Sequence, residues 1–138
     1  MAAKDIYHDI VKRALELENW VITADPLSFS FGDVNFQVDL AAERIIAAEK
    51  DNRKIAVEIK SFLKSSAITD FYSALGQFLS YRLALETVEP NRLLYLAVPL
   101  DTYNTFFQLA FARIAVMKYK LKLIVYDSQQ GGITEWLE

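Results

Sequence analysis

Hydrophobic and polar positions alternate most regularly in the segment IAVEIK, residues 55–60. Successive side chains of a β-strand point to opposite faces, so this segment predicts a strand with one apolar face and one face that carries Glu58 and Lys60. A second alternating stretch, residues 36–48, comes before it. Asp51 and Asn52 between the two tolerate positive φ, which favours a two-residue hairpin turn.

The position of this turn decides which side chains of the two strands share a face. With Asp51 and Asn52 at its centre, the register places Asp39 and Glu43 on the face of Glu58 and Lys60. A slip by one residue moves Asp39 to the apolar face, because side chains alternate with a period of two. The shared face therefore depends on this turn or on a bulge that restores it.

The rest of the pattern predicts an α/β domain in which a mixed central sheet is flanked by helices. An antiparallel meander is expected to carry the polar face, and a parallel crossover between residues 93–98 and 121–126 is expected to complete the core. The expected helices cover residues 4–18, about 66–87 with Ser65 or Ser66 as the cap, and about 101–117 with a break near Ala110. Further strands are expected at 20–23, 29–31 and 133–137.

Specific core positions follow from the same spacing. The first helix should bury Ile6, Ile10, Ala14 and Leu17, and the continuously apolar residues 93–98 should be buried throughout. Gly76 interrupts the second helix without a propensity reason, which indicates a close approach to the sheet.

Composition restricts the class of protein. A chain of 138 residues with 53% hydrophobic residues fits a single domain, residues 1–138. It contains no cysteine, which excludes disulfides and cysteine-type zinc sites and fits a reducing cytoplasm. We find no signal sequence and no apolar run of membrane-spanning length, so we expect a cytoplasmic protein with no membrane segment.

The net charge of −3 argues against tight DNA binding by this chain alone, because lysine and arginine contacts to phosphate supply most non-specific affinity. Basic residues gather locally at Lys118, Lys120 and Lys122. The single histidine, His8, has no serine nucleophile motif near it, and the four glycines form no phosphate-binding loop.

The Glu58-x-Lys60 pattern has a specific chemical use. Carboxylate oxygens suit Mg²⁺ or Mn²⁺, and an ammonium group beside such a metal can orient water and offset the charge of a transition state. The implied chemistry is metal-assisted hydrolysis of a phosphodiester. The simpler alternative is a solvated strand face, and for Gln77 and Tyr81, which share a helix face at i, i+4, it is a pair packed over the sheet.

Together, Asp39, Glu58-x-Lys60 and Gln77-x-x-x-Tyr81 resemble the PD-(D/E)xK nuclease superfamily, in particular its RecB-like branch. The segments AKDIYHDIVK, AAEKDNRKIAVEIKSF, LGQFLSYR and LLYLAVP resemble the XisH family of fdxN-element excision controlling factors. The resemblance implies a restriction-endonuclease-like fold and a role in DNA-element excision, with a small partner called XisI and a separate recombinase. Val38 stands where the superfamily often has proline.

Carried over residue by residue, the resemblance assigns the metal, Mg²⁺ or Mn²⁺, to Asp39, Glu58 and the carbonyl of Ile59. It assigns the positioning of water to Lys60 and the orientation of the site to Gln77 and Tyr81. His8 and Glu43 are additional candidates. The alternative is a non-catalytic accessory factor that keeps the fold and acts by binding DNA and a partner such as XisI.

The stretch from Tyr103 to Tyr119 carries more aromatic and apolar bulk than one helix face can bury. Part of it is therefore expected to be exposed as an association surface, in a homodimer or in a complex with a partner protein. The alternative is a helix break that turns all of the aromatic residues inward.

Overall fold

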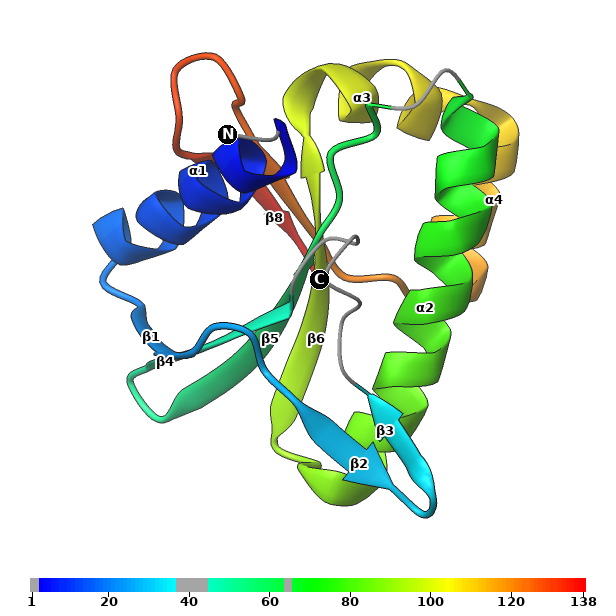
Figure 1. Ribbon diagram of the computed structural model, residues 1–138. Helices are drawn as coiled ribbons and strands as arrows, with labels where there is room; N and C mark the ends of the chain where they lie inside the picture. Colours follow the sequence, from blue (N-terminus) through cyan, green and yellow to red (C-terminus); the bar gives the residue numbers. More distant parts are fainter. Residues whose placement is uncertain (1–2, 37–44, 64–65) are drawn as a thin grey trace.

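The computed structural model describes residues 3–36, 45–63 and 66–138. Within these residues, six strands form one mixed sheet in the order β1-β4-β5-β6-β7-β8, and β2 and β3 form a separate hairpin. Helix α1 covers one face of the sheet, and α2 and α4 cover the other (Figure 1). The predicted mixed sheet flanked by helices is confirmed.

Most of the described boundaries follow the predicted pattern, but the two described ends of the alternating stretch 36–48 belong to different sheets: Phe36 to the separate hairpin and residues 45–48 to the main sheet. The helices are α1 (Ala3–Leu17), α2 (Ala67–Val88), α3 (Leu100–Asn104) and α4 (Ala110–Lys118), with a 3₁₀ turn at Phe106–Gln108. The strands are β1 (Val21–Ala24), β2 (Phe29–Phe31), β3 (Val34–Phe36), β4 (Ile45–Lys50), β5 (Arg53–Ile59), β6 (Arg92–Pro99), β7 (Leu123–Tyr126) and β8 (Ile133–Leu137).

The hairpin of β4 and β5 has the predicted turn and register. Asp51 and Asn52 have φ of 50° and 65°, and Ile45 lies opposite Glu58. Odd-numbered residues of β4 therefore share a face with Glu58. The positions of Asp39 and Glu43, which were predicted to lie on this face, fall outside the described residues.

Parallel pairing joins the central strands. The chain leaves β5, passes through α2 and returns as β6 parallel to β5, and β7 pairs parallel to β6 as predicted. The prediction that residues 93–98 are buried throughout is wrong for Leu93, which is 41% exposed, whereas residues 94–98 are buried. Leu93 is the second residue of β6, where the layer that covers the sheet gives way to solvent.

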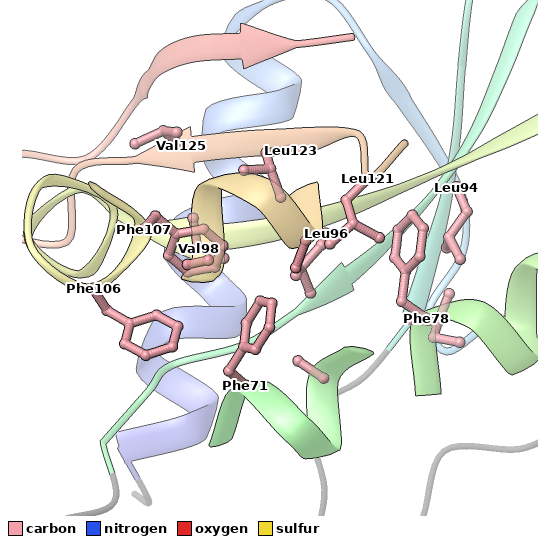
Figure 2. Close-up of a cluster of buried hydrophobic side chains, with 14 of the residues drawn as sticks. Phe71, Phe78, Leu94, Leu96, Val98, Phe106, Phe107, Leu121, Leu123 and Val125 are labelled. Carbon is pink, nitrogen blue, oxygen red and sulfur yellow. The ribbon is translucent and has the colours of Figure 1, made fainter. Parts of the chain in front are cut away.

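The two faces of the sheet bury separate hydrophobic clusters. Phe71 and Phe78 of α2 pack on Leu96 and Val98 of β6 and on the aromatic residues that precede α4 (Figure 2). On the opposite face, residues of α1 pack on Ile55, Val57 and Ile59 of β5, together with Tyr95 and Tyr126. Strand β5 is therefore covered on both sides, including the face that carries Glu58.

Helix α1 buries a different stripe from the predicted one. Ala14 is buried as expected, but Ile6 and Leu17 are 48% and 78% exposed. The buried side chains are instead His8, Val11 and Leu15, which are spaced i, i+3 and i+7. The buried stripe could not be predicted from the apolar residues alone, because a histidine, His8, occupies one of its positions.

Helix α2 begins at the expected cap. The Ser66 side chain accepts a hydrogen bond from the Thr69 amide at 3.3 Å. The prediction that Gly76 permits a close approach to the sheet is wrong, because Gly76 is exposed and a Cβ added there would meet nothing within 4 Å.

The predicted break near Ala110 is confirmed by the separation of α3, the 3₁₀ turn and α4. It turns Phe106 and Phe107 into the core but leaves Phe111 and Met117 54% and 75% exposed. The prediction that part of this apolar stretch stays exposed is therefore confirmed. Among the described residues, no helix has both the length and the apolar character needed to cross a bilayer.

Candidate functional site

Glu58 and Lys60 form a buried ion pair at the end of β5. The two residues are only 1% and 7% exposed, and the Lys60 ammonium lies 3.7 Å from the nearer carboxylate oxygen of Glu58. Side chains two apart on a strand point to the same face, and here α2 covers that face. The simpler alternative, a solvated strand face, is therefore wrong for these two residues.

Gln77 of α2 completes this contact. The Lys60 Nζ donates a hydrogen bond of 2.6 Å to Gln77 Oε1. The ammonium is therefore held between a carboxylate from the strand and an amide from the helix, and the structure brings together three of the residues that the sequence pattern singled out. Hydrogen bonds to charged groups are among the stronger ones in proteins.

Tyr81 lies one helical turn after Gln77 and is half-buried. Burial raises the pKa of the Tyr81 phenol, and the negative charge of Glu58 raises this pKa further. The ring packs edge-on against Phe29 of β2, with 6.3 Å between the ring centroids. Tyr81 therefore keeps its proton near neutral pH and can act as a hydrogen-bond donor beside the ion pair.

The main chain of Lys60 is fixed by two other strands. Its amide donates to the Ala97 carbonyl of β6 at 3.0 Å, and its carbonyl accepts from the Tyr126 hydroxyl of β7 at 3.0 Å. Tyr126 is fully buried and packs against Tyr7 of α1. Sequence reasoning missed Tyr126, because nothing local in the sequence links it to a residue 66 positions away.

His8 belongs to a separate polar cluster with Asp25 and Lys12. One Asp25 oxygen lies 3.0 Å from His8 Nε2 and accepts a hydrogen bond from Lys12 at 3.2 Å. Burial raises the pKa of Asp25, but the hydrogen bonds and positive charges of His8 and Lys12 outweigh burial, so this pKa lies below its ordinary value. The sequence pattern singled out His8 but not Asp25, its partner.

The described residues supply only part of the metal site that the resemblance implies. Glu58 offers hard oxygen donors of the kind that Mg²⁺ and Mn²⁺ prefer. Ile59 turns its side chain to the α1 side of the sheet, so only its carbonyl is available. Within the described part of the chain, no three histidine, aspartate or glutamate residues lie close enough to hold a metal ion. The donor chemistry fits such a cation, but a complete site needs residues such as Asp39.

The fold and the site define a class of protein: a mixed α/β domain in which a Glu-x-Lys pair at the end of a central strand meets a glutamine from the following helix. The family described as XisH protein matches residues 1–134. The chain belongs to the XisH family.

Two solved structures resemble the chain over nearly its whole length. One is an fdxN element excision controlling factor protein from Anabaena variabilis, which is 51% identical, with 97% of this chain and 99% of that chain covered and a TM-score of 0.90. The other is an XisH family protein from Nostoc punctiforme PCC 73102, which is 50% identical, with 97% and 100% covered and a TM-score of 0.91. No curated protein matches the chain.

Proposed function

We propose that this protein acts in the excision of a DNA element in the cytoplasm, as a nuclease that hydrolyses DNA phosphodiesters with the help of Mg²⁺ or Mn²⁺. The observation that carries the proposal is the Lys60 ammonium, held 3.7 Å from Glu58 and 2.6 Å from Gln77 at a strand end. Support for the biological role comes from the similar Anabaena protein, which is described as an excision controlling factor.

In this proposal Lys60 carries the charge that the reaction needs. The ammonium lies beside Glu58, a proposed metal ligand, and is proposed to orient the attacking water there. Its positive charge also offsets the negative charge that develops on the phosphate. Tyr81, which remains protonated, donates a hydrogen bond to a phosphate oxygen of the strand.

Asp39 and Glu58, with the Ile59 carbonyl, are the proposed metal ligands, and Glu43 is an additional candidate. The bound metal would act as a Lewis acid that polarises the phosphodiester. His8 is the weakest of the candidates, because its Nε2 is engaged by Asp25. We further propose that the fold is restriction-endonuclease-like, of the PD-(D/E)xK superfamily, since the Glu-x-Lys strand is the second of an antiparallel pair and the next helix carries Gln77 and Tyr81.

A second candidate function is that of a non-catalytic accessory factor that binds DNA and a partner such as an XisI-like protein. The observation that favours it is the burial of both Glu58 and Lys60, since an ion pair of this kind can serve the fold alone. The exposed apolar residues of α4 also suit a protein that works through a partner.

The test is to incubate the protein, with and without an XisI-like partner, with single-stranded, duplex and branched DNA and Mn²⁺ or Mg²⁺. The wild type is expected to cleave at least one substrate, and chelation of the metal is expected to stop cleavage. Tyr81→Phe and Gln77→Ala should lower the rate, and Lys60→Met should abolish it. Lys54→Ala is the matched control, because Lys54 is an exposed lysine on the same strand.

Each variant needs a far-ultraviolet circular dichroism spectrum, so that lost activity is not confused with lost folding. Calorimetry with Mn²⁺ adds a measurement that does not depend on cleavage. A folded wild type that neither binds Mn²⁺ nor cleaves DNA, even with the partner, would reject the nuclease proposal and favour the accessory factor.

A further inference from the structure

Helix α4 presents apolar side chains to solvent on its outer face. Ala112 and Ala115 point into the core, whereas Phe111, Ile114 and Met117 are 54%, 60% and 75% exposed. A helix that is apolar on all sides is normally covered on all sides. Within the described part of the chain, nothing covers this face.

The apolar face continues into a cavity beside α4. This cavity has a volume of about 560 Å³. Two residues of α4, Arg113 and Met117, line it and so connect it to the exposed face of the helix. Phe107, Leu121, Leu123 and Leu137 are among the other lining residues, so the cavity is largely apolar. The outer face of α4 and this cavity, called here the α4 surface, could accept an apolar stripe together with one inserted side chain.

The rim of the α4 surface is basic. The segment from Thr102 to Tyr126 contains no acidic residue, and its cations are Arg113, Lys118, Lys120 and Lys122. Among the described residues, none of these four cations takes part in an ion pair. Glu138 also lines the cavity, but its carboxylate accepts a hydrogen bond from the Tyr95 hydroxyl and lies 3.5 Å from Arg53. The surface therefore has a positive rim on a protein whose net charge is −3.

We propose that the α4 surface binds an acidic amphipathic segment of another protein. An apolar stripe on the partner would cover Phe111, Ile114 and Met117, and carboxylates beside that stripe would meet the cations of the rim. Such a partner would contact both the apolar face and the basic rim of the surface. The α4 surface shares no residue with the Glu58–Lys60 site, so this binding is independent of whether the protein cleaves DNA.

Two other occupants fit less well. A second copy that used the same surface would bring two sets of four cations together, because a two-fold interface pairs a patch with itself. DNA would satisfy the cations but would leave Phe111, Ile114 and Met117 against a phosphate backbone, where they gain little. Charge and apolar character together therefore favour an acidic protein partner.

The test uses a synthetic helical peptide with leucine at i, i+3, i+4 and i+7 and glutamate on both flanks of that stripe. A matched peptide carries lysine in place of each glutamate, and another carries serine in place of each leucine. Fluorescence anisotropy of the labelled peptides against the full-length protein gives the affinity at low and high salt. Labelled duplex DNA and sedimentation of the protein alone test the other two occupants.

The wild type is expected to bind the acidic peptide saturably and to bind the lysine and serine peptides about tenfold more weakly or not at all. The double variant K118E/K122E and the single variant Ile114→Ser should each lose about tenfold in affinity for the acidic peptide. Lys54→Glu, which reverses an exposed charge on β5, should leave this affinity unchanged, and thermal unfolding midpoints should confirm that every variant is folded.

The proposal is overturned if the acidic peptide does not bind, or if the acidic and lysine peptides bind equally well. It is also overturned if duplex DNA competes with the peptide and the affinity of the protein for DNA is lowered by K118E/K122E. That result would make the surface a DNA contact. A dimer that Ile114→Ser dissociates would instead assign the surface to self-association.

Discussion

Replacing Lys60 by alanine is expected to destabilise the fold, because the change removes the ammonium that lies 3.7 Å from the buried Glu58 carboxylate. Glu58 is only 1% exposed, so water cannot take the place of the ammonium. Breaking a buried ion pair from one side costs about 3–5 kcal/mol. Gln77 also loses the donor that lies 2.6 Å from its amide oxygen. Since domains are stable by only about 5–15 kcal/mol in total, the loss would be a large fraction of the free energy of unfolding.

Urea denaturation followed by tryptophan fluorescence and by far-ultraviolet circular dichroism measures this loss. Glu58→Gln combined with Lys60→Met is the informative comparison, because it removes both charges while nearly keeping both volumes. We expect the double variant to recover most of the stability, since replacing a whole buried pair is often close to neutral. Lys54→Ala, an exposed lysine on the same strand, should change the free energy of unfolding by less than about 0.5 kcal/mol.

The reasoning fails if Lys60→Ala changes the free energy of unfolding by no more than Lys54→Ala does. Such a result would mean that Glu58 is hydrated or neutral in the folded protein, and that the ion pair contributes little. The same measurement, applied to the Lys60→Met variant of the nuclease assay, guards that assay, because a variant that is partly unfolded would lose activity for a trivial reason.

Other positions make separate predictions. The pKa of Asp25 is lower in the folded protein than its ordinary value of 3.8. The Asp25 carboxylate therefore contributes its full stability at pH values above 3.8, and this contribution is lost as the pH falls through the lower pKa of the folded protein. The difference in urea stability between wild type and Asp25→Asn should therefore shrink below that pH. Burial and the Glu138 carboxylate raise the pKa of Tyr95 to about 12, so stability should fall as the pH rises from 10 to 12, and Tyr95→Phe should reduce that fall. Gly76→Ala should raise the free energy of unfolding by about 0.5–1 kcal/mol, because the site is helical, exposed and open to a Cβ; a destabilised variant would contradict the observed space.

The sequence was sufficient where the signal is local. Asp51 and Asn52 specify the turn by their tolerance of positive φ, and the position of this turn sets the register of β4 and β5. Ser66 specifies the start of α2 in the same way. The parallel pairing of β6 and β7 followed from the handedness of crossovers, which is also a general rule.

The sequence was insufficient where burial depends on a distant partner. A strand that alternates apolar and charged residues normally has one solvent-exposed face, but Glu58 and Lys60 are buried because α2 covers them and its Gln77 accepts a hydrogen bond from Lys60. His8 is buried on α1 for the same reason, since Asp25 accepts its hydrogen bond. Neither partner follows from spacing along the chain. The part of the candidate site that includes Asp39 lies outside the described residues.

The attachment of Lys60 to β6 and β7 has a consequence for the time at which the site forms during synthesis. The hairpin of β4 and β5 joins neighbouring residues, and hairpins form within about 1–10 μs. The hydroxyl that holds the Lys60 carbonyl belongs to Tyr126, 66 residues later, and at about 5–20 residues per second the ribosome takes several more seconds to make it. The growing chain therefore carries Glu58 and Lys60 well before it can fix their geometry. We expect the site to become competent only after Tyr126 has been synthesised and can donate to the Lys60 carbonyl.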